Sequence, residues 1–240
     1  MLMHQAAQRE GLYGPSFGRR QRGRFLAGAI ALLALLTTGL MKDIASAQTA
    51  GSAARTIKLV ALGDSLTAGY GLPDAAAFPA VLEAALKARG HKVEIANAGV
   101  SGDTASGGLE RLEWSVPDGT DGVILELGAN DMLRGIDPDT TKRALDAIVT
   151  RLKARGIPVL LAGMYAGRNL GPDYVRRFDA IYPALAEKHG LILYPFFLDG
   201  VAGQPKLALP DGLHPTAEAI RLVVARILPS VEAFLARLNT

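Results

Sequence analysis

The sequence has 240 residues, of which 49% are hydrophobic and 20% charged, a composition typical of one globular domain. It contains no cysteine, which excludes disulfides, thiol nucleophiles and cysteine-based metal sites. Six of the 26 basic and two of the 23 acidic side chains precede residue 48, so the net charge of +3 belongs to the N-terminus. Because the remainder is nearly neutral, we expect no nucleic-acid partner.

The N-terminal segment has the order of a secretory signal. Clustered arginines precede an uncharged, mostly apolar run from Phe25 to Met41, and the small-residue stretch ASAQTA follows. This pattern predicts a signal peptide over residues 1–47, cleaved after Ala47, and an exported protein, periplasmic or secreted. An uncleaved anchor over residues 25–41 is the alternative, because the run is at the lower limit of a membrane span. We expect a linker over residues 48–55 and a monomeric domain over residues 56–240 that contacts membranes only through an uncleaved N-terminal segment.

From residue 56 onward, short apolar runs alternate with longer amphipathic ones. The short runs predict strands at residues 57–62, 92–97, 122–128, 157–163 and 191–197. Helical spacing of apolar residues predicts helices at residues 78–89, 138–156, 174–189 and 216–238. Such alternation is typical of βαβ crossovers, so we predict an α/β fold: a five-stranded parallel sheet of flavodoxin-like order, covered by helices on both faces.

In a sheet of this kind, the working site lies beyond the carboxyl ends of the strands. The loops at those ends are polar and glycine-rich: GDSLTAGYG follows the first strand, NAGVSGDTASGG the second and GANDMLRG the third. Ser65, in the first of these loops, is a candidate nucleophile. A serine nucleophile needs a base within hydrogen-bond reach, and an acid that holds the base. The alternative role of Ser65 is to cap a helix.

The base must be a histidine, since only imidazole both accepts and returns a proton near neutral pH. His4 lies in the leader, His91 precedes a strand at the opposite end of the sheet, and His189 lies at a helix end. His214 lies in LPDGLHPT, three residues after Asp211, a spacing that can place the carboxylate against Nδ1 and leave Nε2 for the serine. The alternative is a plain turn before a helix.

An acyl-transfer site also needs hydrogen-bond donors for the developing oxyanion. The backbone N–H groups of Ser65 and Gly102 and the side-chain amide of Asn130 are the candidates. The simpler alternatives are a turn glycine at Gly102 and a local side-chain turn at Asn130. For Asp64 and Asp131, which adjoin these positions, we expect structural hydrogen bonds.

Four blocks, GDSLTAGYG, NAGVSGDT, LGANDMLRG and DGLHP, resemble in order and spacing those of the SGNH (GDSL) hydrolase family. The residues in these blocks are most similar to those of the exported acyl-thioesterase/lysophospholipase branch, often labelled arylesterase. The Ser, Gly, Asn and His that name the family fall on Ser65, Gly102, Asn130 and His214, and its third triad member falls on Asp211. The resemblance implies a three-layer α/β/α fold, hydrolysis through an acyl-serine intermediate without metal or cofactor, and a shallow site with broad substrate tolerance.

The sequence therefore predicts a serine esterase that acts on small-molecule acyl esters and extends to thioesters or lysophospholipids. Met164, Tyr165 and Leu170, after the fourth predicted strand, are candidates for a substrate groove, with ordinary loop packing as the alternative. Two other functions stay open: a carbohydrate O-acetylesterase on the same fold, and a non-catalytic lipid- or glycan-binding module. The sequence has no GxGxxG, P-loop or HExxH motif, and Ser65 lacks the second glycine of a G-x-S-x-G elbow.

Overall fold

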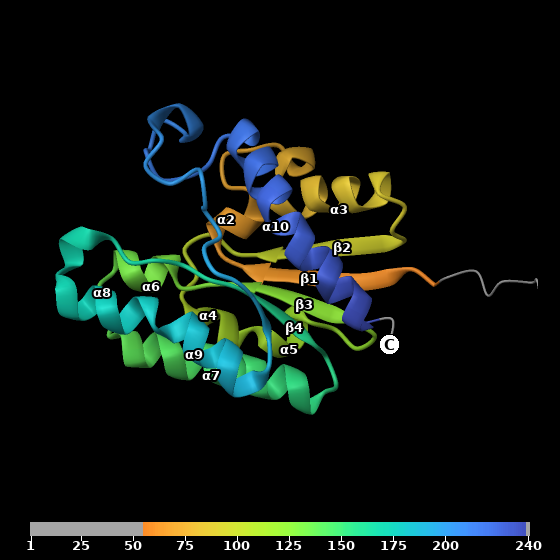
Figure 1. The fold of residues 1–240 in the computed structure, drawn as a ribbon, viewed down its shortest axis with the longest axis horizontal. Helices are drawn as coiled ribbons and strands as arrows, with labels where there is room; N and C mark the ends of the chain where they lie inside the picture. The colour runs from red at the N-terminus through yellow and green to blue at the C-terminus, as the bar shows by residue number, and fades with distance from the viewer. Residues whose placement is uncertain (1–54, 239–240) are drawn as a thin grey trace, which may run out of the picture. The chain divides into compact units, whose positions relative to one another are not determined.

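The computed structural model describes residues 55–238, so the predicted signal peptide and nearly all of the predicted linker lie outside the described residues. The described part contains one five-stranded sheet with the strand order β2-β1-β3-β4-β5, and all neighbouring strands are parallel (Figure 1). The strands are β1 (Ile57–Gly63), β2 (Val93–Gly99), β3 (Gly122–Glu126), β4 (Val159–Ala162) and β5 (Ile192–Tyr194). This order confirms the predicted flavodoxin-like sheet.

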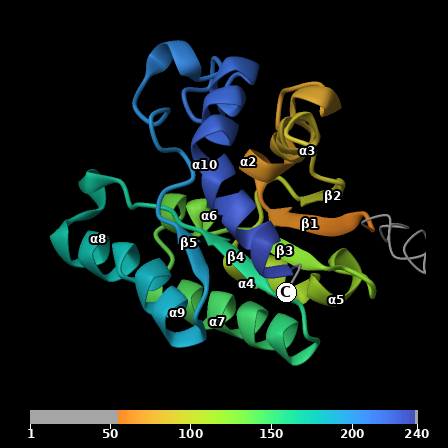
Figure 2. The same ribbon diagram turned by 45° about the vertical axis from the view of Figure 1, so that its right-hand side comes forward.

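Helices cover both faces of the sheet (Figures 1 and 2). One face carries α3 (Phe78–Ala88) and α10 (Ala217–Leu238), which pack against each other. The other face carries α4 (Ala105–Glu110), α5 (Leu112–Ser115), α7 (Pro138–Ala154) and α9 (Ile181–His189). The remaining elements are α2 (Ser65–Ala68), α6 (Ala129–Leu133), α8 (Pro172–Asp179) and the single 3₁₀ turns η1 (Asp74–Ala76), η2 (Arg168–Leu170) and η3 (Pro205–Leu207). Between residues 55 and 238, no helix is both long and apolar enough to cross a membrane.

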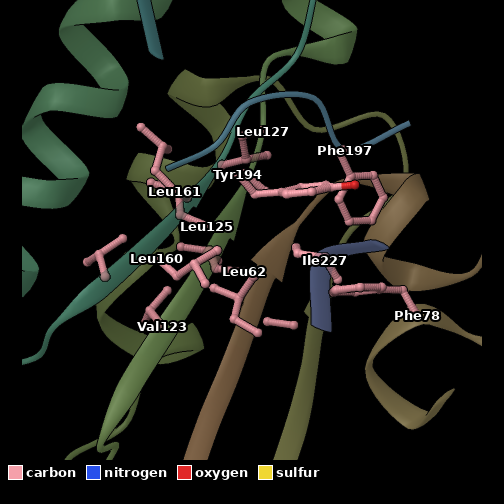
Figure 3. Packing of buried hydrophobic residues seen from close by; sticks show 14 of the residues in the cluster. Leu62, Phe78, Val123, Leu125, Leu127, Leu160, Leu161, Tyr194, Phe197 and Ile227 are labelled. Atoms are coloured by element: carbon pink, nitrogen blue, oxygen red, sulfur yellow. The ribbon is translucent and has the colours of Figure 1, made fainter. Parts of the chain in front are cut away.

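The core lies on both sides of the three central strands. β1, β3 and β4 are buried along almost their whole length, because helices cover them above and below, whereas the edge strand β2 alternates between buried and exposed residues. On the α3 and α10 side, Leu62, Phe78 and Ile227 meet in one layer (Figure 3). Phe78 also packs edge-on against Phe197, with ring centroids 4.9 Å apart. This packing fixes the carboxyl ends of the strands.

Arg111 ties the carboxyl ends of β1 and β2 together. Its guanidinium is almost fully buried and donates hydrogen bonds to the carbonyl oxygens of Gly63, at 2.8 Å, and Ala98, at 2.9 Å. The Nε atom lies 2.5 Å from the carboxylate of Asp103, which offsets the cost of burying the charge. These bonds therefore fix the positions at which the loops after β1 and β2 begin.

Two features of the helices differ from the sequence-based expectation. The helix predicted over residues 174–189 is two helices, α8 and α9, separated at Ala180. Pro183 explains the break, because a proline lacks the amide hydrogen of a helix interior but fits the first turn of a new helix. The short helices α2, α4, α5 and α6 were not predicted, since helices of four to six residues are too short to display a periodic apolar face.

Candidate active site

Ser65 is the first residue of α2, where the chain turns sharply from β1 into a helix. The Asp64 side chain caps this helix by accepting a hydrogen bond from the backbone N–H of Leu66 at 3.0 Å. Gly63 makes the turn possible, because a Cβ at this position would lie 2.0 Å from Oγ1 of Thr67. The helix cap is therefore Asp64, and Ser65 follows it with 8% of its surface exposed.

The histidine nearest Ser65 is His214, from the loop that precedes α10. His214 Nε2 lies 2.9 Å from Ser65 Oγ, and His214 Nδ1 lies 2.6 Å from Asp211 Oδ2. The loop is held by a backbone hydrogen bond from the Leu209 N–H to the His214 carbonyl, at 2.7 Å. In the neutral ring protonated at Nδ1, imidazole donates to the carboxylate and accepts from the serine hydroxyl. The three side chains named from the sequence thus lie in one hydrogen-bonded chain.

Asp211 is held as an anion by its surroundings. Its Oδ1 accepts from the backbone N–H groups of His214, at 3.0 Å, and Leu213, at 2.9 Å. These two bonds, followed by the hydrogen bond with the His214 ring, lower the pKa of the Asp211 carboxyl to about 2. The carboxylate is therefore ionised throughout the neutral range and able to orient the imidazole.

Gly102 and Asn130 lie in the loops after β2 and β3, at the same edge of the sheet as Ser65. Gly102 has a φ of 85°, a backbone conformation that favours glycine, and its carbonyl accepts a hydrogen bond from Arg134 Nη2 at 2.7 Å. Asn130 belongs to α6, and its Nδ2 donates to Asp64 Oδ2 at 3.1 Å. One amide hydrogen of Asn130 is used there, which leaves the second available for a ligand.

Two carboxyl groups are buried beneath Ser65. Asp64 and Glu126 are 0% and 1% exposed, and Thr67 Oγ1 of α2 donates to Glu126 Oε2 at 2.7 Å. Burial raises the pKa of Asp64 to about 6, even though Leu66 and Asn130 donate hydrogen bonds to it. Burial and then the neighbouring Asp64 carboxylate raise the pKa of Glu126 well above its ordinary value. Burial thus disfavours the charged form of Glu126, which sequence reasoning placed only as a strand residue.

Asp131 has the structural role expected from the sequence. Its Oδ2 accepts from the backbone N–H of Ala105 at 2.8 Å, and its Oδ1 accepts from Thr141 Oγ1 at 2.9 Å. These bonds join α6 to the start of α4 and to α7. The structure therefore fixes the position of α6, which carries Asn130.

The three residues proposed for a substrate groove differ in exposure. Met164 is only 3% exposed and packs in the core, so its burial argues against a direct contact with substrate. Tyr165 is 41% exposed and stacks on Phe196, with ring centroids 4.9 Å apart. Leu170 is partly buried against the core. Of the three, Tyr165 offers the largest apolar surface to a ligand.

A cavity of ≈ 530 Å³ has His214 in its lining. Its lining comes entirely from residues 198–215 and consists mainly of leucine, valine, proline and small residues, without Lys, Arg, Asp or Glu. The apolar wall beside His214 was not predicted, because the segment has no helical or strand periodicity.

The other two histidines of the described segment pair with carboxylates that do not belong to the site. His91 Nε2 lies 3.3 Å from Glu232, and His189 Nε2 lies 2.6 Å from Asp146. Within residues 55–238, no group of three or more His, Asp or Glu side chains is placed to hold a metal ion.

Comparisons with known proteins agree with one another. The sequence model described as the GDSL-like Lipase/Acylhydrolase family matches residues 61–222. "Esterase TesA" of Pseudomonas aeruginosa is 35% identical over 215 residues, which are 89% of this chain and 100% of that protein. "Thioesterase 1/protease 1/lysophospholipase L1" of Escherichia coli is 39% identical over 168 residues, 70% of this chain and 79% of that protein.

A solved structure gives the same result. The crystal structure of "AlinE4, a SGNH-hydrolase family esterase" has a TM-score of 0.64 and 45% sequence identity, and the match covers 77% of this chain and 99% of that chain. The matched region of the family includes every residue described above for the site.

Proposed function

Because the chain belongs to the GDSL-like lipase/acylhydrolase family and is an ester hydrolase, we propose that Ser65 is its nucleophile, His214 its general base and Asp211 the acid that orients the base. The hydrogen-bonded chain from Asp211 through His214 to Ser65 is the observation that carries this proposal. A serine hydroxyl is activated when an imidazole accepts its hydrogen bond and a carboxylate holds that imidazole in place.

In the proposed reaction, His214 Nε2 takes the Ser65 proton as Oγ attacks the acyl carbonyl. Asp211 keeps the ring in the tautomer that accepts this proton and stabilises the imidazolium that forms. The N–H groups of Ser65 and Gly102 and the free amide hydrogen of Asn130 hold the oxyanion. His214 then gives its proton to the leaving alcohol or thiol. Water, activated by the same imidazole, releases the acid from the acyl-serine.

We further propose that the acyl group is longer than acetyl and that thioesters and lysophospholipids are substrates alongside carboxylic esters. Exposed apolar side chains support this proposal: Val100, Leu133 and Tyr165 follow β2, β3 and β4 at the edge of the sheet where Ser65 lies. An exposed apolar surface beside a reactive group favours an apolar chain. The name of the Escherichia coli relative, which includes thioesterase and lysophospholipase, agrees with this substrate range.

The N-terminal residues complete the proposal. We infer that residues 1–47 form a signal peptide, followed by a linker over residues 48–55 and the catalytic domain over residues 56–240. The basic and apolar order of the leader supports export to the periplasm or beyond, with a membrane anchor over residues 25–41 as the alternative. We propose that the exported enzyme acts as a monomer.

The test is a panel of p-nitrophenyl esters from acetyl to octanoyl, with an acyl-CoA thioester and a lysophospholipid, on wild type and Ser65→Ala. We expect activity that extends to octanoyl in the wild type and background hydrolysis in the variant. Ester hydrolysis that survives Ser65→Ala would rule out this nucleophile. Activity confined to acetate would instead favour a carbohydrate O-acetylesterase.

A further inference from the structure

Tyr70 places its ring against the face of the proposed base. The centroids of the Tyr70 and His214 rings are 4.4 Å apart, and the ring planes are tilted by 37°. Tyr70 reaches this position from the same short turn as Ser65: its backbone N–H donates to the Ser65 carbonyl at 3.1 Å. The turn depends on Gly69, whose φ is 81° and whose added Cβ would lie 2.6 Å from Cβ of Ala77.

The hydrogen bonds of His214 leave one motion of its ring unrestrained. Asp211 bonds at Nδ1 and Ser65 at Nε2, and the N–H and lone pair of the ring nitrogens point along the plane of the imidazole. Rotation about the line that joins the two nitrogens costs these bonds little. A ring packed on the face of the imidazole opposes this rotation.

We propose that Tyr70 is a positioning residue that holds the His214 imidazole against Ser65 through this face contact, an inference that rests on the proposed function. The contact matters most after Ser65 is acylated, because the hydroxyl then no longer donates to Nε2. During deacylation the ring is held by Asp211 and by Tyr70. The aromatic face also lies next to the imidazolium that forms at each proton transfer, an interaction that favours the cation.

The two segments that carry these rings are joined by a second contact. Gly71 follows Tyr70, and a Cβ at this position would lie 2.8 Å from Cδ1 of Leu209, so the backbone passes close to that side chain. The backbone N–H of Leu209 in turn donates a hydrogen bond to the His214 carbonyl. The glycines on either side of Tyr70 thus let the turn after α2 approach the histidine loop closely enough for the rings to touch.

The test compares Tyr70→Leu and Tyr70→Phe with wild type, on p-nitrophenyl butyrate. Loss of the ring in Tyr70→Leu should lower kcat by about two- to tenfold, the size of an aromatic pair contact, and leave KM unchanged. Tyr70→Phe keeps the ring and should retain the wild-type kcat. Trp114→Leu is the matched control: Trp114 is a 74% exposed aromatic residue on α5 and its removal should leave kcat unchanged.

Thermal denaturation of each variant separates positioning from folding. Tyr70 is 52% exposed, so we expect Tyr70→Leu to unfold within a few degrees of wild type, and Tyr70→Ser provides a second test if it does not. A wild-type kcat in a folded Tyr70→Leu or Tyr70→Ser enzyme would overturn the proposal. A rise in KM alone would make Tyr70 a substrate contact, and an equal loss in Tyr70→Phe would assign the effect to the hydroxyl. None of these results depends on Ser65→Ala, which tests the nucleophile separately.

Discussion

The replacement Asp64→Asn tests the cost of the buried carboxyl under the active site. Asp64 is 0% exposed, and its pKa of about 6 lies above the ordinary value of 3.8. Between these two values the folded protein binds more protons at this site than the unfolded chain does. The free energy of unfolding therefore falls as pH rises from about 4 to about 6, and the loss persists at higher pH.

The pKa difference sets the magnitude. A rise of the pKa from 3.8 to about 6 corresponds to a free energy on the order of 3 kcal/mol, at about 1.36 kcal/mol for each pH unit. Asparagine does not ionise, so Asp64→Asn escapes this loss. The free energy of unfolding of the variant minus that of wild type should therefore increase by up to about 3 kcal/mol between pH 4 and pH 7. Asp64→Asn also removes the charge that raises the pKa of Glu126, which acts in the same direction.

The assay is urea denaturation of both proteins at pH 4, 5, 6 and 7, followed by circular dichroism. A difference that stays constant across this range would refute the reasoning, because it would mean that Asp64 ionises equally in the folded and unfolded states. We also expect Asp64→Asn to lose activity. An amide nitrogen at residue 64 would face Nδ2 of Asn130, and a rotated Asn130 would direct its oxygen at the oxyanion.

Two further predictions concern the other polar groups of the site. Asn130→Ala removes one proposed oxyanion donor and should lower kcat by ~10²–10³ with little change in KM, measured on a p-nitrophenyl ester; a rise in KM at unchanged kcat would contradict that role. Asp211→Asn should fold, because its Oδ1 can still accept from the N–H groups of Leu213 and His214, but its amide donates to Nδ1 and favours the ring protonated at Nε2. That tautomer cannot accept the Ser65 proton, so kcat should fall by ~10³–10⁴, and retention of more than a tenth of wild-type kcat would argue against the triad.

The sheet and the main helices could be predicted because their apolar patterns are long and unambiguous. The runs at residues 57–62 and 122–128 match β1 and β3 within two residues at either end. The loops beyond them could then be assigned to one edge, since parallel strands all end there. His214 could be identified as the candidate base because the other histidines lie elsewhere in the predicted fold. These inferences need only the direction of the strands and the order of the chain.

The contacts between loops could not be predicted in the same way. Nothing in the local pattern around Tyr70 indicates that its ring meets His214, because the two residues are far apart in sequence and neither lies in a periodic element. Glu126 continues the apolar run of β3, and its burial beside Thr67 depends on how closely α2 approaches that strand. Met164 follows β4, where a groove residue was expected, but its side chain turns inward to the core. Such side-chain directions are set by tertiary packing.

The buried carboxyl of Asp64 lowers the stability of the fold but has two structural roles at the site. An apolar residue there would avoid the cost of ionising a buried carboxyl, yet it would leave Asn130 without its acceptor and α2 without its cap. The same carboxyl therefore fixes the helix that begins at Ser65 and the amide proposed to hold the oxyanion. A stabilising substitution at this position should lower activity for that reason. Stability and catalysis oppose each other at Asp64, as expected where one group holds two parts of a site.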